Sequence, residues 1–341
     1  MSEEDRCIRC GSCMRACPVV STFGESVFPG PRSLAVDAPR TGKPMSMDEL
    51  LKCSICMMCR DACPSRIDLP RSILALRAAN RRGTLRPGHK RLVENIDSYG
   101  YSVRPDEGVH GPYPCKGPTT CLFPGCISRW RRPEILDDAA YVLRSNGTEV
   151  ACPEDLVCCG SPLEKIGEHE RRERLVDRNF PILEKFERVV TTCPGCAGQI
   201  VGYGIDAMHI VEYLYEVVGV EHLVSGLDGK GLKIAVHMPC HLNRDVGPHT
   251  KEYVHSILGA IPGLKVVEYP EEDRCCGAGG SLLSGFPEMA AALAKGKASA
   301  ADRAGADLIV TSCPFCVVNL TNAGTMRTLD IVSLLRTASN R

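Results

Sequence analysis

Ten of the twenty-one cysteines in this 341-residue chain form a five-cysteine pattern that occurs twice. Each copy has a single cysteine, then a Cys-Cys-Gly doublet, then a Cys-Pro-x-Cys pair, with more than thirty residues in each gap. Thiolates bind soft metal centres such as zinc and iron–sulfur clusters. The repeated spacing therefore indicates ligands that folding brings together at two metal centres. The first copy comprises Cys126, Cys158, Cys159, Cys193 and Cys196, and the second comprises Cys240, Cys275, Cys276, Cys313 and Cys316.

The first third of the chain carries another cysteine pattern, Cys-x2-Cys-x2-Cys-x3-Cys-Pro, which also occurs twice, at an offset of 46 residues. In bacterial two-cluster ferredoxins, the fourth cysteine of each such run binds the other cluster. Zinc is the alternative, but zinc sites usually take cysteines in pairs, whereas three cysteines fall within seven residues here. We therefore expect one cubane [4Fe-4S] cluster on Cys7, Cys10, Cys13 and Cys63, and a second on Cys53, Cys56, Cys59 and Cys17.

The composition excludes several classes of protein. Lysine plus arginine and aspartate plus glutamate both number 41, so nothing indicates a nucleic-acid partner. No apolar run approaches the roughly 20 residues that a membrane helix needs. Residues 1–6 are charged and contain no export signal, and an intracellular chain rich in cysteine is more typical of metal binding than of disulfides. We expect a cytoplasmic protein without a direct membrane span, which could reach the cytoplasmic face of a membrane through a partner.

Short apolar or β-branched runs precede the cysteines of the five-cysteine patterns, and helical patterns separate these runs. Alternating strands and helices indicate parallel α/β sheets, whose sites gather at the carboxyl ends of the strands. The cysteines are therefore expected to converge. The predicted strands cover 119–123, 148–151, 189–192, 232–237, 264–269 and 308–312, and the predicted long helices cover 133–144, 168–186, 250–258 and 287–304.

The predicted fold class is α/β, with a mainly helical ferredoxin-like domain followed by two repeated cysteine-rich lobes. The domains are 1–82 (ferredoxin-like), 83–118 (linker rich in glycine and proline), 119–228 (first lobe) and 229–341 (second lobe). In the first domain we expect a non-helical link at 28–32, a short helix at 47–52 and an amphipathic helix at 70–82. The arginines of the last helix either form a solvated face or contact an acidic partner or coenzyme.

Longer motifs surround the cysteines: Pro124-Gly125-Cys126, Cys158-Cys159-Gly160, Pro239-Cys240-His241-Leu242, Arg274-Cys275-Cys276-Gly277-Ala278-Gly279-Gly280 and Cys313-Pro314-Phe315-Cys316. With these motifs, essentially the whole chain resembles the cysteine-rich-domain (CCG) family of iron–sulfur oxidoreductases. The resemblance is strongest to the D subunit of heterodisulfide reductase, which is similar to the C and B subunits of the three-subunit enzyme fused end to end.

The resemblance implies that each five-cysteine pattern holds one noncubane [4Fe-4S] cluster. The implied function is that of a catalytic subunit that reduces the coenzyme M–coenzyme B disulfide to two thiols, with the two cubane clusters feeding the two noncubane clusters. Splitting a disulfide takes two electrons and an iron–sulfur cluster passes one at a time, so two clusters suit the reaction. The implied partners are the small-molecule disulfide and an electron-donating protein, a flavoprotein or membrane cytochrome b, in a hetero-oligomeric complex.

The chain departs from the family pattern in its first lobe and in three extra cysteines. The first doublet is followed by Ser161-Pro162-Leu163 instead of a glycine-rich tail. Cys115, Cys121 and Cys152 fit neither pattern, and we interpret them as buried or free thiols. Cys121, five residues before Cys126, is the candidate accessory ligand among them.

Polar residues beside the ligands are candidates for catalysis. His241 follows a predicted ligand directly and is a candidate proton donor to a leaving thiolate, with a structural hydrogen bond as the alternative. Arg129, Arg131 and Arg132 follow Cys126 within six residues. They are candidates for binding the anionic groups of a disulfide, with a solvated loop or a partner contact as the alternative.

Asn243 and Arg244 are weaker candidates for the same roles. Gly160, Gly277 and Gly279 are the candidate cofactor-binding glycines, and Gly280 is expected to act with the last two, because glycine lets the backbone approach a cluster closely. No Lys-Ser/Thr follows the glycine-rich segment, which disfavours a phosphate-binding loop.

The alternative function is electron transfer in a flavin-dependent dehydrogenase complex of the glycerol-3-phosphate, glycolate, lactate or thiol:fumarate type. In many related chains of that kind one five-cysteine pattern is incomplete, whereas both are complete here. The thiol-oxidising fumarate reductase chain carries an extra N-terminal [2Fe-2S] domain, which we do not find in this sequence. No Gly-x-Gly-x-x-Gly signature occurs, so a flavin would come from a partner. A non-enzymatic iron–sulfur or zinc scaffold is a third class.

Overall fold

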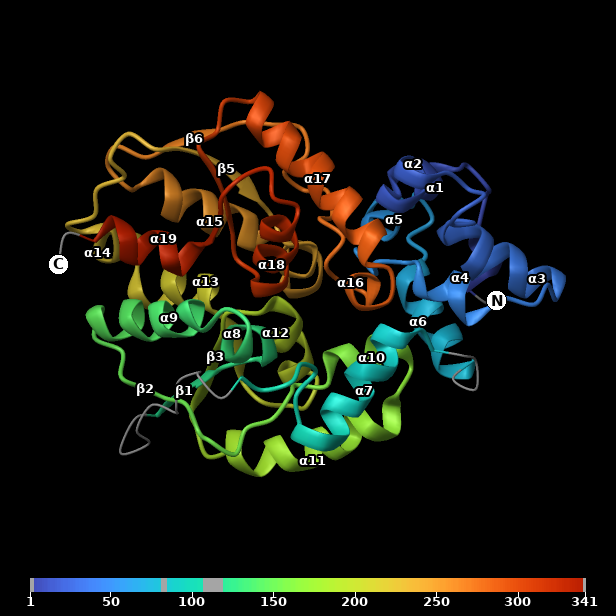
Figure 1. Cartoon of the computed structure of the whole chain (residues 1–341), viewed down its shortest axis with the longest axis horizontal. Helices are drawn as coiled ribbons and strands as arrows, with labels where there is room; N and C mark the ends of the chain where they lie inside the picture. Colours follow the sequence, from blue (N-terminus) through green and yellow to red (C-terminus); the bar gives the residue numbers. More distant parts are fainter. Residues whose placement is uncertain (1–2, 81–84, 107–118, 340–341) are drawn as a thin grey trace.

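Two α/β lobes, each with a four-stranded parallel sheet, form the larger part of the molecule, and a helical N-terminal module packs at one end (Figure 1). The structure is a computed structural model that describes residues 3–80, 85–106 and 119–339. It confirms the predicted fold class, with a mainly helical N-terminal domain and two repeated α/β lobes. Cys115 lies outside the described residues.

The two sheets have the same topology. The first has the strand order β2-β1-β3-β4, the second repeats it as β6-β5-β7-β8, and all neighbouring strands are parallel. The central strands are rich in β-branched residues and almost entirely buried, as expected for strands covered on both faces. The strands are β1 (Thr120–Phe123), β2 (Val150–Ala151), β3 (Arg188–Thr191), β4 (Ala207–His209), β5 (Lys233–His237), β6 (Lys265–Val267), β7 (Leu308–Thr311) and β8 (Thr328–Asp330).

Helices connect the strands and cover both sheets. The first lobe contains α8 (Cys126–Trp130), α9 (Pro133–Ser145), α10 (Ser161–Ile166), α11 (His169–Leu183), α12 (Pro194–Val201), α13 (Ile210–Tyr213), η3 (Leu214–Val218) and α14 (Val220–Val224). The second contains η4 (Leu242–Val246), α15 (His249–Gly259), α16 (Leu282–Gly285), α17 (Pro287–Arg303), α18 (Pro314–Asn322) and α19 (Ile331–Ala338). Among the described residues, no helix is both long and apolar enough to cross a bilayer.

The two lobes pack against each other through reciprocal contacts. Helix α9 of the first lobe packs on α19 of the second. Their counterparts in the other lobe make the same contact, because α15 of the second lobe packs on α13 of the first. Likewise, α12 contacts η4 while α18 contacts α8. This exchange is the pattern of an isologous two-fold interface, here within one chain. Buried apolar residues of both sheets, such as Leu122 and Ile234, belong to one continuous core.

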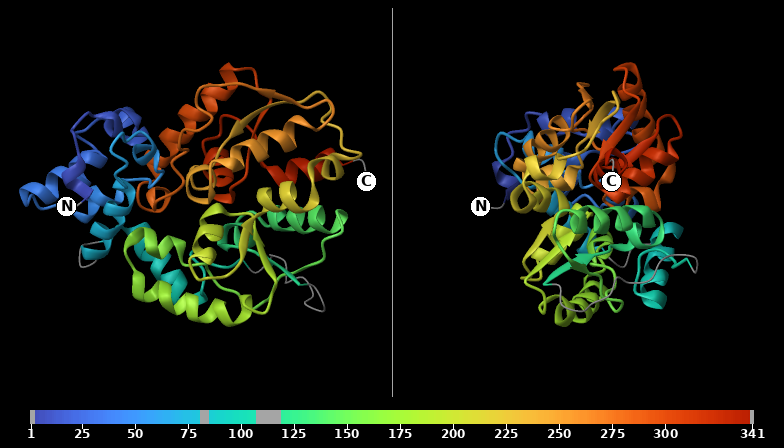
Figure 2. Two further views of the ribbon diagram at one scale, coloured as in Figure 1. Left: turned by 180° about the vertical axis from the view of Figure 1, so that it is seen from behind. Right: turned by 90° about the vertical axis from the view of Figure 1, so that its left-hand side faces the viewer.

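The N-terminal module contacts both lobes. Its helix α6 packs on α10 of the first lobe, and α2 packs on α17 of the second (Figure 2). An ion pair of 2.8 Å joins Arg244 Nε of the second lobe to Asp61 Oδ2 of the module. The module consists of η1 (Glu3–Arg6), α1 (Ser12–Ala16), α2 (Pro18–Phe23), η2 (Ser33–Asp37), α3 (Ala38–Thr41), α4 (Met47–Leu51), α5 (Met58–Asp61) and α6 (Leu69–Ala79).

Each predicted strand and long helix is present, with ends that differ by at most three residues. The predicted non-helical link is helical from Pro31 onward, because proline suits a first helical turn. The sequence missed β4 and β8, which are three residues long, and helix α7 (Pro87–Tyr99), which lies inside the predicted linker and packs on α16. The glycine and proline residues around α7 led the sequence analysis to predict a linker instead of a helix.

Gly280 marks a close approach of the second lobe to the N-terminal module. Its φ is +63°, and a Cβ there would lie 2.2–2.7 Å from backbone atoms of Ser54. We predict that Gly280→Ala lowers the free energy of unfolding by about 1–3 kcal/mol more than Gly324→Ala does. A difference of this size is the typical cost of overpacking. Gly324 also has a positive φ, but nothing lies within 4 Å of a Cβ there, so it controls for backbone strain. Anaerobic thermal unfolding measures both variants, and equal losses would contradict the close approach.

Candidate metal centres

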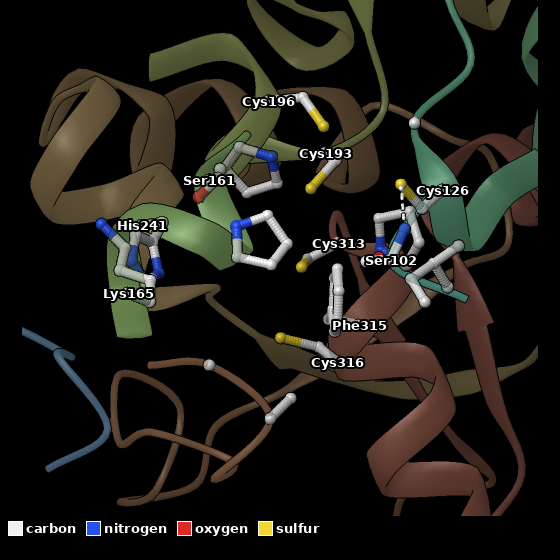
Figure 3. Close-up of a pocket in the computed structure, with 18 of the residues that line it drawn as sticks. Ser102, Cys126, Ser161, Lys165, Cys193, Cys196, His241, Cys313, Phe315 and Cys316 are labelled. Atoms are coloured by element: carbon white, nitrogen blue, oxygen red, sulfur yellow. Dashed lines mark hydrogen bonds between the residues drawn. The ribbon is translucent and has the colours of Figure 1, made fainter. Parts of the chain in front are cut away.

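All ten cysteines of the five-cysteine patterns line one cavity between the two lobes, called here the shared cavity. Figure 3 labels five of them: Cys126, Cys193, Cys196, Cys313 and Cys316. The carboxyl ends of the central strands bring them there. Cys126 lies three residues after β1 and Cys193 two residues after β3. Cys240 and Cys313 stand at the same distances from β5 and β7. The cysteines thus converge as the strand pattern predicts.

Two short helices fix the spacing within the Cys-Pro-x-Cys pairs. Cys193 is the N-cap of α12 and Cys313 is the N-cap of α18, each followed by proline at the first helical position. Residues three apart lie on the same side of a helix, so Cys196 and Cys316 present their sulfurs beside those of the caps. Each pair therefore offers two neighbouring thiols to one centre.

Sulfur–sulfur contacts link the cysteines within each set. In the second set, Cys276 Sγ lies 3.4 Å from Cys316 Sγ. In the first set, hydrogen bonds from Cys158 and Cys196 lower the pKa of Cys159 to about 5. The pKa of Cys193 is also lowered, because Cys196 and a cysteine of the other set both hydrogen-bond to its sulfur. The same contacts raise the pKa of the partner thiols Cys158 and Cys196, so a metal that binds there would have to displace their protons.

The two sets meet where the lobes meet. Cys193 of the first lobe contacts Cys313 of the second through their sulfurs. These two residues occupy equivalent positions in the repeat, since each caps the helix after the third strand of its lobe. Equivalent residues touch each other only near a two-fold axis. The approximate two-fold axis therefore passes through the shared cavity, with one five-cysteine set on each side.

Two buried asparagines, which the sequence analysis missed, hold the doublets in place. Asn179 Nδ2 on α11 donates to the carbonyl oxygen of Cys158 at 3.0 Å. In the second lobe, Asn319 Nδ2 on α18 donates to the carbonyl oxygen of Cys276 at 2.7 Å. Both asparagines are almost fully buried. The only signal in the sequence is a polar residue on an otherwise apolar helix face.

The N-terminal module contains two separate cysteine-lined cavities. Cys7, Cys10, Cys13 and Cys63 line the first, and Cys17, Cys53, Cys56 and Cys59 line the second. The structure thus brings together the two predicted sets of four cysteines, in which the fourth cysteine of each run joins the first three of the other run. Burial raises the pKa of Cys53 to about 11, so a metal would have to displace its proton on binding.

The loops that carry these cysteines have an unusual backbone. Arg9, Ile55, Met57 and Arg66 have φ between +51° and +65°, in the left-handed region that residues other than glycine seldom adopt. Each lies between or just after cysteines of the two runs. The left-handed turns wrap the loop around a common centre, which fits a compact cluster with several closely spaced ligands. Four thiols in each N-terminal cavity and five in each set of the shared cavity are soft donor sets that suit iron–sulfur clusters.

The second N-terminal cavity adjoins the second lobe. The sulfur of Cys56 contacts that of Cys275, and both residues pack in one buried cluster with Cys240. By contrast, Cys10 of the first N-terminal cavity is exposed. The cysteine sites therefore run from the surface through the N-terminal module to the second lobe and then to the first lobe.

His241 lies at the shared cavity, as its position beside Cys240 suggests. Its Nδ1 is 3.5 Å from Cys240 Sγ, and its buried Nε2 has no hydrogen-bond partner among the described residues. Burial, together with the charge of Lys165, lowers the pKa of His241 to about 4, which leaves the ring neutral near pH 7. Lys165 also lines the cavity, and its ammonium group lies 3.1 Å from Glu164 Oε2 (Figure 3). Sequence reasoning missed Lys165, which lies on the short helix α10 and is distant in sequence from the second-lobe ligands.

The three candidate arginines after Cys126 do not line the shared cavity. Arg129 is buried with its guanidinium over the rings of Tyr101 and Trp130. Arg131 donates to main-chain carbonyls, and Arg132 pairs with Glu134. Their role in binding substrate anions stays a prediction from the sequence.

Asn243 and Arg244 also bond away from the cavity. Asn243 Nδ2 donates to Asp273 Oδ1 at 3.2 Å, and Arg244 donates to the carbonyl oxygen of Asp273 in addition to its ion pair with Asp61. Both side chains therefore stabilise the loop before the second doublet and its junction with the N-terminal module.

The glycines beside the doublets allow close packing of protein groups. A Cβ at Gly277 would lie 3.1 Å from backbone atoms of Ala290 on α17, and one at Gly160 would lie 3.0 Å from Arg172. Gly279 lies at the cavity, where a Cβ would come within 3.4 Å of His241. Their cofactor-binding role stays a prediction.

A further histidine and two extra cysteines lie near the sets. A nitrogen of His237 and the sulfurs of Cys276 and Cys316 lie within 4.8 Å of one another, a grouping the sequence analysis missed. Cys121, in β1, and Cys152 are buried, and neither lines the shared cavity. The structure thus offers His237, more than Cys121, as a neighbour of a set.

The cysteine patterns match two known domain families. Residues 120–201 and 234–321 match the family described as Cysteine-rich domain, and residues 3–67 match the 4Fe-4S dicluster domain. The chain belongs to the family of iron–sulfur proteins that combine these domains. The dicluster domain indicates two 4Fe-4S clusters, and the cysteine-rich domains imply further iron–sulfur clusters.

Curated relatives include components of two methanogen enzymes. Over 96% of its length the chain is 30% identical to the B subunit of the fumarate reductase (CoM/CoB) of Methanothermobacter marburgensis, of which it spans 71%. It is 33% identical to an uncharacterized iron–sulfur protein of Methanocaldococcus jannaschii, of which it spans 66%. It is 26% identical to the D subunit of the dihydromethanophenazine:CoB–CoM heterodisulfide reductase of Methanosarcina barkeri, with 97% of this chain and 92% of that protein aligned. These relatives are subunits of oxidoreductases or iron–sulfur proteins.

A solved structure shares the fold. The crystal structure of a hypothetical protein from Helicobacter pylori superposes with a TM-score of 0.62 over 96% of this chain and 71% of that one. The sequence identity is 11%, so the likeness concerns the fold alone.

Cys121 tests which cysteines hold metal. We predict that Cys121→Ala keeps the full iron content of the chain, because its side chain is buried in β1 and does not line the shared cavity. Cys126→Ala, as the matched change five residues away, is expected to lower the iron content. Iron analysis of anaerobically purified protein measures both variants. Iron loss in Cys121→Ala equal to that in Cys126→Ala would make Cys121 a ligand.

Proposed function

We propose that this chain is the catalytic iron–sulfur subunit of a heterodisulfide reductase, which reduces the coenzyme M–coenzyme B disulfide to two thiols. The observation that carries the proposal is the shared cavity, where both complete five-cysteine sets face each other across one space. A subunit that only passed single electrons would need no pair of sites around a common cavity. The cleavage of one S–S bond needs two electrons and two protons and yields two thiols.

The proposed ligands follow the cavities. Two cubane [4Fe-4S] clusters would be held by Cys7, Cys10, Cys13 and Cys63, and by Cys17, Cys53, Cys56 and Cys59. Two noncubane [4Fe-4S] clusters would be held by the five-cysteine sets of the two lobes. When bound, such clusters supply electrons one at a time and offer iron to a thiolate.

The chain's own residues would bind and orient the disulfide. Lys165 brings a positive charge to a cavity that is otherwise mostly apolar, which suits an anionic group of the substrate. His241 has a buried Nε2 without a partner, which can hydrogen-bond to a sulfur or to a substrate oxygen. With its pKa lowered to about 4, His241 acts as a neutral hydrogen-bonding group, and a proton it passes on must be replaced from solvent.

The order of the sites supports an electron donor that docks on the N-terminal module. Cys10 is exposed and Ile8 beside it is 69% exposed, so the first cubane site is within reach of a partner. Electrons would then pass to the second cubane site and through the Cys56–Cys275 contact to the second lobe. The proposed partner is a flavoprotein or membrane cytochrome b, in a complex in the cytoplasm or at the cytoplasmic face of the membrane.

A second candidate is a role in a thiol:fumarate type complex, in which the same cavity oxidises two thiols to the disulfide. The relative at 30% identity, which is named as part of a fumarate reductase (CoM/CoB), favours this candidate. The two candidates use the same bond and the same cysteine sets, and they differ in the direction of electron flow and in the partner.

The first experiment counts iron and tests for thiol binding. We expect about 16 iron atoms per chain after anaerobic purification, four from each of four clusters. Adding coenzyme M thiol under oxidising conditions should produce a paramagnetic signal, because the thiol binds at a cluster of the shared cavity. Iron near half that value, or no thiol-dependent signal, would contradict the proposal.

A ligand variant identifies the cluster that responds. Cys275→Ser is expected to remove the thiol-dependent signal or the disulfide reduction, since Cys275 lines the shared cavity. Cys152→Ser is the control, because Cys152 is buried outside that cavity. Full disulfide reduction by Cys275→Ser would refute the second-lobe assignment. Adding fumarate and a flavoprotein partner in place of a reductant then separates the two candidates.

His241 provides a test of the non-ligand chemistry. We predict that His241→Gln keeps the iron content and lowers kcat for disulfide reduction by about 100-fold, the low end of the loss for a positioned proton-transfer group. His222→Gln is the control, because His222 is exposed on α14 and does not line the shared cavity. An unchanged kcat in His241→Gln would leave this residue with a structural role.

A further inference from the structure

Arg77 is a fully buried arginine at the junction of all three parts of the molecule. It lies on α6, and its side chain has 0% exposure, unlike the exposed Arg71 on the same helix. The sequence analysis expected the arginines of this helix either to form a solvated face or to contact an acidic partner or coenzyme. Buried Arg77 does neither.

The guanidinium of Arg77 uses each of its five N–H donors on main-chain carbonyls. Nε and one terminal nitrogen donate to Leu50 at 3.1 and 2.7 Å, and that same nitrogen donates to Cys53 at 2.6 Å. The other terminal nitrogen donates to Lys165 at 2.6 Å and to Gly280 at 3.1 Å. Two of the acceptors belong to the N-terminal module, one to the first lobe and one to the second. A single side chain thus ties the three parts together.

The backbone packs tightly around this side chain. A Cβ at Gly167 of the first lobe would lie 2.7 Å from the carbonyl oxygen of Arg77. On the other side, Gly280 of the second lobe allows no Cβ because of Ser54. Both neighbours are glycines with positive φ, so the two lobes approach the module as closely as backbones can.

The charge of Arg77 has no carboxylate partner among the ion pairs of the described residues. A buried charge without a counter-charge is costly, so this position calls for a nearby anion. The side chain keeps its positive charge at neutral pH, because a guanidinium is effectively always protonated in proteins. Cys53 lines the second N-terminal cavity, and its thiolate would belong to a cluster there.

We propose that Arg77 is a positioning residue that locks the second N-terminal cluster against both lobes and supplies the positive charge that raises its reduction potential. The proposal rests on the ligand set proposed above for that cluster. An iron–sulfur cluster held by four thiolates is an anion, and it gains one more negative charge when it accepts an electron. A fixed positive charge stabilises the reduced form more than the oxidised form, and net charge and hydrogen bonding are among the factors that set such potentials.

Three variants of the full chain test the two parts of this proposal. Arg77→Met removes the charge and the hydrogen bonds, Arg77→Lys keeps the charge but has only three donors, and Arg71→Met is the control. Redox titration followed by electron paramagnetic resonance measures the potential of the second N-terminal cluster. Hydrogen–deuterium exchange measures the opening of residues 53–57 and 279–282 at the junction.

In Arg77→Met we expect a more negative potential and faster exchange in both segments. In Arg77→Lys we expect faster exchange with the potential close to that of the wild type, and in Arg71→Met neither quantity should change. An unchanged potential and exchange in Arg77→Met would overturn the proposal, as would an equal effect of Arg71→Met. If Arg77→Met does not fold, Arg77→Lys is the deciding variant. Hydrogen–deuterium exchange that is unchanged in Arg77→Lys, or a reduction potential that is lowered in it, overturns the proposal.

Failure of the proposed function gives a different result. If the wild-type chain holds no second N-terminal cluster, its iron count and paramagnetic spectrum reveal this before any variant is measured, and the proposed ligand set is wrong. The exchange comparison between Arg77→Lys and Arg71→Met would still report whether Arg77 ties the three parts together.

Discussion

The meeting of the carboxyl ends of two parallel sheets is the constraint on which the site depends. In a parallel sheet every strand ends at the same edge, so the loops that follow the strands share one place. Because the two lobes pack through reciprocal helix contacts, these edges face each other across the shared cavity. Ten cysteines from segments nearly two hundred residues apart in sequence are thereby placed around a single space.

The parts of the fold that were predictable are those that local sequence determines. The central strands are apolar and β-branched, and the ferredoxin-like runs set the spacing of their own ligands, so both follow from the residues directly. The strands β4 and β8 are too short for any periodicity, and α7 begins at a proline in a segment rich in turn residues. Lys165, His237 and Arg77 have their roles through contacts with residues far away in the chain, and a single sequence carries no record of such contacts.

The N-terminal module is joined to both lobes by shared apolar packing and by polar links. Its buried apolar residues form one cluster with residues of both lobes, such as Leu163 and Phe286. The ion pair of Asp61 with Arg244 and the hydrogen bonds of Arg77 add polar links at the same junction. Electron transfer between clusters depends steeply on distance, so a rigid junction would keep the second N-terminal site at a constant separation from the second lobe.

The approximate two-fold axis makes the two lobes equivalent to a homodimer whose two copies have been fused into one chain. A true homodimer must place identical residues on both sides of its axis, whereas a fused pair is free to diverge. At the cavity, Phe315 stands where the first lobe has Gly195, and at the end of the central strand His237 stands where the first lobe has Phe123. The proposed substrate is a mixed disulfide with two unlike halves, and a site that has lost its symmetry in this way could tell one sulfur from the other.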